Sequence, residues 1–356
     1  MSQKYKKQGK LGMFGEHFRL EKLSKQGDPL ERLNFVINWE AFVSILQKLD
    51  NQDKKSNAGA KPYAPLLMFK ILILQRYYNL SDNQIEYQIL DRLSFGRFLG
   101  ITLNDKVPDE KTVWDFKERM VELELEKELF AVFHSTLEEN GLIAHEGKII
   151  DASFVEMPRQ RNNREENKHI KQTGTAPESW ANKPNKKRQK DIDARWTKKN
   201  NENHYGYKDH IKMDNKHKFI DTYHTTSASV HDSQVLDELL DKKNDKGKDL
   251  WADSAYTGEE QEKTIVKYKM NNCVHEKGTR GNPLTQKQKD SNKEKSKTRV
   301  RVEHVFGFIE GSMNKFYLNC IGIKRASAGV GIINLTYNLF RYEQLVRLHR
   351  INMSNH

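Results

Sequence analysis

The sequence predicts an α/β protein in which a mixed β-sheet covered by helices follows an all-helical N-terminal domain. In residues 16–140 the apolar residues recur at helical spacing. From residue 141 onward, short apolar runs alternate with helical stretches in the order strand, hairpin, helix, strand, helix, strand and helix. This order is typical of a mixed sheet with helices packed on it. A chain of 356 residues is long enough for two such domains.

The N-terminal part divides into an arm and a series of helices. Residues 1–15 look like a disordered basic arm and lack the apolar segment of a secretion signal. Residues 17–49 carry apolar residues suited to helical packing, and Pro65–Tyr78 is expected to be a buried helix with Pro at its start. Ser81 begins a capping box, and Pro108–Thr112 is a second helix start.

Two helices joined by a turn in residues 16–140 fit a helix-turn-helix that reads a major groove. We therefore expect this region to be a DNA-binding domain. An ordinary helical bundle explains the same pattern, however, and the pattern by itself favours the bundle. No residue that would read a base can be named here.

Within Gly147–Phe154, Ile149 and Ile150 form a short apolar run that ends on an acid, Asp151. We expect this run to be a buried strand. An acid at the end of a buried strand is costly unless it is paired or holds a metal. Asp249–Ser254 is a second such strand, which ends on Asp253. Between them, residues 205–213 and 219–226 look like the two strands of a hairpin.

Helices and one last strand complete the predicted sheet domain. Asp232–Leu240 and Glu259–Met270 read as helices, and Asn272–Glu276 reads as a strand. His231 precedes the first of these helices, so Asp232 or Ser233 is expected to be its N-cap. A basic loop then leads to a helix with Glu303 beside an apolar stripe, and Val330–Leu348 is the C-terminal helix.

The charge balance favours a polyanionic partner. The chain has 61 Lys and Arg against 49 acids, a net charge of +12, which suits nucleic acid or an acidic membrane equally. The excess is concentrated in Arg159–Asn200 and Gln286–Arg301. The longest apolar run, Pro65–Leu74, is too short to span a bilayer, so we expect a cytoplasmic protein with no membrane partner. Two distant cysteines argue against a disulfide framework and a Cys-type zinc site.

Residues 159–203 form a long polar and basic insertion that contains Trp180 and Trp196. Basic residues interleaved with aromatics suit phosphate contact together with base stacking. A solvated linker explains the same composition equally well. The two tryptophans could stack on a base, or they could equally pin the insertion to the sheet.

Asp151, Asp253 and Glu303 are the candidates for a metal site. Two acids on adjacent strands and a third on a covering helix could converge, and like charges at short distance raise each other's pKa. Divalent cations relieve that repulsion. In a two-metal site one ion activates the attacking oxygen and the other stabilises the leaving oxygen. Periodicity alone does not select these three residues from the 49 acids.

A family resemblance does select them. The chain resembles bacterial insertion-sequence transposases of the DDE type, specifically the group named insertion sequence five, over nearly everything from residue 16 to 348. The matching stretches occur in the expected order: Gly27-Asp28-Pro29, Asn38-Trp39-Glu40, Leu80-Ser81-Asp82, Val107-Pro108-Asp109, Ile150–Val155, His204–Lys208, Val230–Ser233, Ala252–Tyr256 and Val302–Gly307.

The resemblance implies an RNase H-like catalytic domain in residues 141–350, with Asp151, Asp253 and Glu303 as a triad that binds two Mg²⁺ (or Mn²⁺) ions. The implied function is a DNA transposase that cleaves element ends and transfers the 3′-hydroxyl to target DNA. Its partners would be terminal inverted repeats, target DNA and, on DNA, a second copy of the chain, at the nucleoid. The alternatives are a catalytically silent DNA-binding regulator and an RNase H-like nuclease without strand transfer.

Related groups often carry a Tyr-x-x-Arg-x-x-x-Glu pattern followed by Lys seven residues after the Glu. Here Arg299 and Glu303 fit, but Ser296 stands at the Tyr position and Glu310 at the Lys position, so Lys315 is a candidate substitute for that lysine. Arg299 would either bind a phosphate or pair with Glu303. The residues expected to contact DNA are Arg299, Arg301, Lys208, Lys315, Lys186, Lys187 and Arg188.

Overall fold

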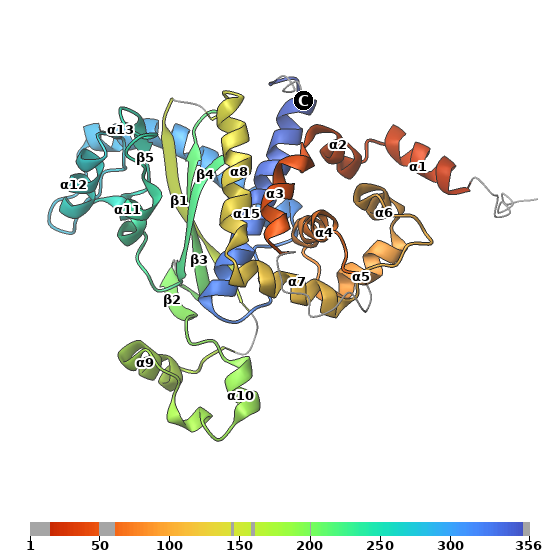
Figure 1. Cartoon of the computed structure of the whole chain (residues 1–356). Coiled ribbons are helices and arrows are strands. Elements are labelled where there is room, and N and C mark those ends of the chain that lie inside the picture. Colours follow the sequence, from red (N-terminus) through yellow and green to blue (C-terminus); the bar gives the residue numbers. More distant parts are fainter. Residues whose placement is uncertain (1–14, 50–60, 144–145, 158–160, 200, 352–356) are drawn as a thin grey trace, which may run out of the picture.

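The computed structural model describes residues 15–49, 61–143, 146–157, 161–199 and 201–351, so residues 1–14 of the predicted basic arm lie outside the described part. The described residues form a six-stranded mixed sheet flanked by helices, with a helical N-terminal region (Figure 1). The predicted fold class, an α/β sheet domain of RNase H-like type behind a helical region, is confirmed.

Helices make up the N-terminal region, as predicted. Three of them begin at side-chain caps: Asp28 accepts the N–H of Leu30, Ser81 and Gln84 form a capping box, and Asp109 caps the helix that starts at residue 110. The elements are α1 (Gly15–Lys25), α2 (Pro29–Val36), η1 (Trp39–Phe42), α3 (Val43–Leu46), η2 (Gln47–Leu49), α4 (Pro65–Tyr77), α5 (Asp82–Asp91), α6 (Leu93–Leu99), α7 (Glu110–Glu122) and α8 (Leu125–Glu139).

The sheet is built around β1 (Lys148–Glu156), which has an antiparallel neighbour on one side and a parallel neighbour on the other. The antiparallel neighbour is β3 (Glu202–Asp214), which also pairs with β2 (Arg195–Lys199) and β4 (Ile220–Ser227). The parallel neighbour is β5 (Asp249–Trp251), followed by the short β6 (Asn271–Asn272).

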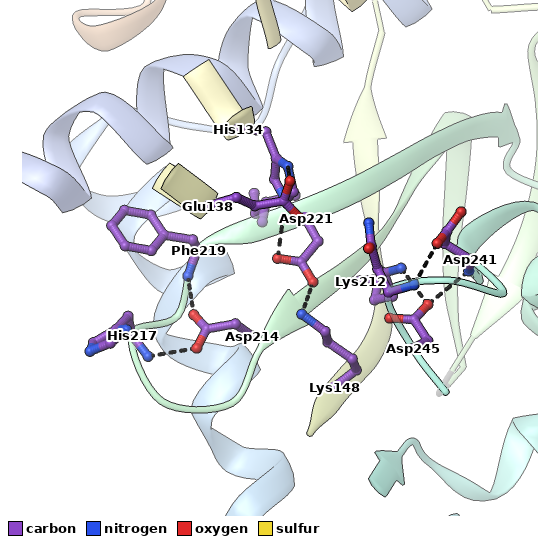
Figure 2. A network of polar contacts seen from close by, with 12 residues as sticks. His134, Glu138, Lys148, Lys212, Asp214, His217, Phe219, Asp221, Asp241 and Asp245 are labelled. Carbon is purple, nitrogen blue, oxygen red and sulfur yellow. Dashed lines mark hydrogen bonds and ion pairs between the residues drawn. The ribbon is translucent and has the colours of Figure 1, made fainter. Parts of the chain in front are cut away.

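The predicted hairpin is the pair β3–β4, and Asp214 fixes its turn. Its carboxylate accepts the backbone N–H groups of Lys216, His217 and Phe219, the last at 2.9 Å (Figure 2). These three local bonds close the turn.

The two faces of the sheet carry different helices. Alternate residues of β1 enter different apolar cores, since Ile149 packs with the C-terminal helix α15 (Ile323–Arg347) and Ile150 packs with α11 (Leu236–Leu239) and α12 (Glu259–Lys267). The core that contains Ile149 also takes in α2, α4, α6, α7 and α8. The N-terminal helices and the sheet therefore share one core, with α15 between them (Figure 1).

Buried ion pairs tie the start of β1 to neighbouring elements. Lys148, 1% exposed, donates to Asp221 of β4, and Lys212 of β3 donates to Asp245 at 2.6 Å. His134 of α8 lies 3.5 Å from the Asp221 carboxylate (Figure 2). The pairing satisfies charges that would otherwise be too costly to bury.

Several predicted elements differ from those observed. β1 continues to Glu156, so Asp151 lies inside the strand rather than at its end, and residues 152–154 after it are half-buried. The last strand is the two-residue β6 rather than 272–276. His231 caps the 3₁₀ turn η4 (Asp232–Val235) through its ring nitrogen, in place of Asp232 or Ser233. The C-terminal helix begins at Ile323, before the predicted Val330.

The predicted basic loop before Glu303 is a helix. α13 (Gln286–Arg299) buries none of its residues, so its sequence has no apolar stripe to reveal it. A capping box between Thr285 and Gln288 starts it. It is followed by η6 (Val300–Val302), α14 (Glu303–Gly307) and the π-helical turn η7 (Phe308–Ser312).

The basic insertion is ordered in its described residues. It contains α9 (Arg164–Thr173), η3 (Glu178–Trp180) and α10 (Pro184–Gln189) ahead of β2. Trp180 is 1% exposed and donates its indole N–H to Glu166 at 2.9 Å, and Trp196 donates to the carbonyl of Asn162 at 2.8 Å. Both tryptophans therefore pack within the protein. No helix of the described residues is both long and apolar enough to cross a membrane.

Candidate active site

Asp151 lies on β1 with its carboxylate mostly covered. Oδ1 accepts the N–H of Ala152 at 2.8 Å, and Oδ2 accepts a hydrogen bond from Arg299 at 2.9 Å. Burial raises the pKa of Asp151 to about 6; the nearby Asp253 also raises it, while the Ala152 N–H and the Arg299 guanidinium lower it. The pairing of β1 with β5 thus brings two of the predicted acids into each other's electrostatic range.

Asp253 follows β5 and is the N-cap of η5 (Ser254–Tyr256), where Oδ1 accepts the N–H of Ala255 at 2.8 Å. This cap fixes the direction of the side chain. Tyr256, 1% exposed, lies near Asp232, Asp151 and Asp253, which all act to raise the pKa of its hydroxyl beyond the effect of burial. The hydroxyl has no hydrogen-bond partner in the described part of the chain.

Glu303 begins α14, and its side chain is 62% exposed. The Arg299 guanidinium lies between this acid and Asp151, with Nη2 at 3.8 Å from Glu303 Oε1. The sequence predicted that Arg299 would either bind a phosphate or pair with Glu303. The structure shows the pairing with Glu303, together with a shorter bond to Asp151.

The donor chemistry of the three acids fits a hard divalent cation, because carboxylate oxygens are the ligands that Mg²⁺ and Mn²⁺ prefer. Among the described residues, no three His, Cys, Asp or Glu side chains lie close enough together to hold one ion as they stand. The charge of Asp253 acts on Asp151, and Glu303 is exposed and paired with Arg299. The three acids therefore fit such a cation in the chemistry of their donor atoms.

Four of the residues predicted to contact DNA are engaged within the protein. Lys208 is 8% exposed and donates to Asp232 at 2.7 Å, so it lies inside the domain rather than on its surface. Arg301 donates to Asn215 in the β3–β4 turn at 2.7 Å, and Lys186 pairs with Glu166 at 2.6 Å. Arg299 is the fourth, as described above. The remaining three, Lys187, Arg188 and Lys315, are exposed.

α13 supplies basic residues that the sequence analysis did not single out. Its inner face is polar: Asn292 exchanges two hydrogen bonds with the backbone of Glu276, and Lys295 donates to the carbonyl of Val274 at 2.9 Å. Arg299 continues this face to Asp151. The opposite side presents an exposed row with one lysine per turn, made up of Lys289, Lys293 and Lys297.

The capping box at Thr285 and the four-residue spacing of these lysines are the signals that could have identified the helix and its basic row. The row ends at Lys297, two residues before Arg299, which contacts both Asp151 and Glu303. It is therefore placed to hold a polyanion at the edge of the candidate site.

Two family models match the chain. One is described as a transposase domain and matches residues 18–119, and the other is described as a transposase DDE domain and matches residues 144–339. A solved structure, described as a cryo-EM structure of piggyBac transposase synaptic complex with hairpin DNA, is 11% identical over 92% of this chain and 77% of that chain, with a TM-score of 0.44.

Proposed function

The chain belongs to the DDE transposase family, and from that premise we propose that it cleaves the ends of an insertion sequence and joins the freed 3′-hydroxyl to target DNA. We place it in the insertion sequence five group and propose Asp151, Asp253 and Glu303 as its metal-binding acids. One observation carries the site assignment: Asp253, which follows β5, is near enough to Asp151 on β1 for its charge to raise the pKa of Asp151, and Arg299 links Asp151 to Glu303.

Each residue of the site has a distinct part in this proposal. Bound divalent ions, which we take to be two Mg²⁺ or Mn²⁺ per site, would supply positive charge beside the attacking and leaving oxygens. Asp151 and Asp253 are held in place by backbone N–H groups, so they can bind cations with little reorganisation. Arg299 offers a guanidinium to the scissile phosphate once Glu303 turns inward.

DNA enters this proposal as terminal inverted repeat and as target. The lysine row of α13 and the exposed Lys187, Arg188 and Lys315 would contact the phosphate backbone. We further propose that the helical N-terminal region binds the element end and that two copies hold two ends together, at the nucleoid in the cytoplasm.

Asp253→Asn tests the assignment. Asn is also a good N-cap, so the variant keeps the bond from Ala255 and its fold while losing one ligand charge. We expect cleavage of terminal-repeat DNA with Mg²⁺ to fall to background while DNA binding, measured by gel shift, stays unchanged. The matched control is Asp237→Asn on α11, an exposed acid paired with Lys267.

Cleavage by Asp253→Asn at the wild-type rate would remove Asp253 from the site. The same assay separates the alternatives, because a silent regulator binds without nicking and a simple nuclease nicks without joining 3′ ends to target DNA.

A further inference from the structure

A cavity of about 500 Å³ lies where the N-terminal helices, the basic insertion and the C-terminal helix meet. Its wall comes from α4, α5, α7, α8, α10, α15 and residues 319–321, and none of the three candidate catalytic acids lines it. Cavities of this volume are typical of sites for small ligands. It is therefore a second candidate site, separate from the triad.

Two ionisable side chains on this wall, Arg76 and Glu126, have hydrogen-bonding atoms that no described residue satisfies, although the charge of Asp82 acts on Arg76. The half-buried side chain of Arg76 makes no hydrogen bond or ion pair with any described residue, and burial lowers the pKa of its guanidinium. Glu126 is 3% exposed, and its Oε2 has no hydrogen-bond partner among the described atoms. The other charges that face each other across the wall are paired, as Asp82 with Lys117 and Glu118 with Arg325.

An unpaired guanidinium inside a cavity is costly unless something binds it. Its planar donors match the oxygens of a phosphate or a carboxylate better than any neutral group. The Glu126 carboxyl on the same wall can bond the N–H or amino groups along the edge of a planar ring. The ligand that satisfies both groups has an oxyanion at one end and a hydrogen-bonding ring at the other.

Trp114 of α7 supplies an aromatic surface on the same wall. Its side chain is 48% exposed, and it is the most exposed of the five tryptophans. The floor beside it is apolar and includes Leu72, Val121 and Ile332. Exposed indole faces stack on nucleobases.

The basic insertion contributes Arg188 and Gln189 from α10 to the cavity wall. Arg188 is exposed and forms no ion pair in the described structure, so it adds a second free positive charge. A ligand here would contact three parts of the chain at once.

We propose that this cavity binds one nucleotide, with its base against Trp114 and its phosphate at Arg76. The nucleotide is either a free nucleoside monophosphate or one unit of a single-stranded stretch of DNA, since the recognition chemistry is the same. The site goes beyond the reaction proposed for the triad and does not depend on it.

Trp114 fluorescence measures the binding. The full chain is titrated in a chelator, so that no strand is cut, with short single-stranded oligonucleotides and with deoxynucleoside monophosphates of each base. We expect quenching of tryptophan emission that Trp114→Phe removes. Arg76→Gln should weaken binding by about tenfold or more, the loss of a charge-assisted hydrogen bond. The control Arg19→Gln, an exposed arginine on α1, should bind like the wild type.

Binding of monophosphates as tight as that of oligonucleotides identifies a free nucleotide, and binding of oligonucleotides alone identifies a unit of a DNA strand; either supports the site. The proposal is overturned if no probe quenches the emission, if the emission of Trp114→Phe is quenched as strongly as that of the wild type, or if Arg76→Gln binds with wild-type affinity. Thermal unfolding of each variant shows whether it is folded.

Discussion

Two buried carboxyl groups of this sheet have pKa values shifted in opposite directions, because their neighbours differ. Asp221 is held by His134, Lys148 and Lys212, which together overcome the effect of burial and lower its pKa to about 2. Asp209 of β3 is fully buried, and neither of its carboxyl oxygens has a hydrogen-bond partner among the described atoms. Burial raises the pKa of Asp209 to about 8, and the nearby Asn334 side chain opposes that rise. The first acid stabilises the fold when charged, and the second when neutral.

Asp209→Asn should therefore stabilise the protein at neutral pH. The folded state keeps the Asp209 proton up to about pH 8, whereas the unfolded chain releases it near the ordinary pKa of about 4, so stability falls as pH rises between these values. We expect Asn to remove this dependence and to add roughly 2–4 kcal/mol at pH 7. Urea unfolding at pH 5 and pH 8 measures it, with the exposed Asp115→Asn as control. An equal stability difference at both pH values would contradict the prediction.

Lys148→Met should destabilise the protein, because it leaves Asp221 charged and buried without its closest partner. Breaking one side of a buried ion pair costs about 3–5 kcal/mol. The double variant Lys148→Met with Asp221→Leu should recover most of that loss in chemical denaturation. A double variant no more stable than Lys148→Met would show that the ion pair with Asp221 is not the reason for the lost stability.

At the scale of elements, α13 shows how a helix can be held without apolar burial. Its inner face makes polar contacts to residues 274–276 and ends at Arg299, so the outer lysine row is aligned with the candidate site. A helix anchored in this way keeps its lysines available to a partner. The same anchor fixes the start of α14 and so the position of Glu303.

Replacing Lys289, Lys293 and Lys297 with Gln should weaken DNA binding. It should also make the binding constant less dependent on salt concentration. Each phosphate contact contributes about 0.9 to the slope of log K against log salt, so the slope should fall by about 2–3. The control replaces Lys242, Lys243 and Lys246, which are exposed in the loop before β5, at the end of that strand away from Asp253. An unchanged slope would show that DNA does not lie along α13.

At the scale of the whole molecule, α15 joins the helical region to the sheet. It packs against α2, α4, α7 and α8 as well as β4, and its Phe340 stacks on Tyr77 with ring centroids 3.6 Å apart. One apolar core contains residues of both regions, among them Leu30 of α2 and Leu345 of α15. We therefore expect the two regions to unfold together.

Phe340→Ala should destabilise both regions at once. Phe340 is 4% exposed, and truncating a buried Phe costs about 3–5 kcal/mol. Unfolding followed by far-UV circular dichroism and by tryptophan emission should give a single shared transition, shifted to lower urea. Tyr87→Ala, at a 64% exposed position on α5, is the control. Two separate transitions would show that the regions are independent domains.

The local features of the fold could be predicted from the sequence. Ser81 and Asp109 predicted helix starts because capping involves only residues within one turn. The β3–β4 hairpin was predictable for the same reason, since Asp214 closes its turn from nearby. The fold class followed from the order of such segments, and the choice of Asp151, Asp253 and Glu303 followed from family resemblance; their roles stay a prediction.

Which distant residues meet depends on the tertiary structure. The parallel pairing of β1 with β5 brings Asp151 near Asp253, although about a hundred residues separate them. The packing of β3 directs Lys208 inward to Asp232. Such outcomes depend on pairing and packing between distant segments, which no local pattern encodes.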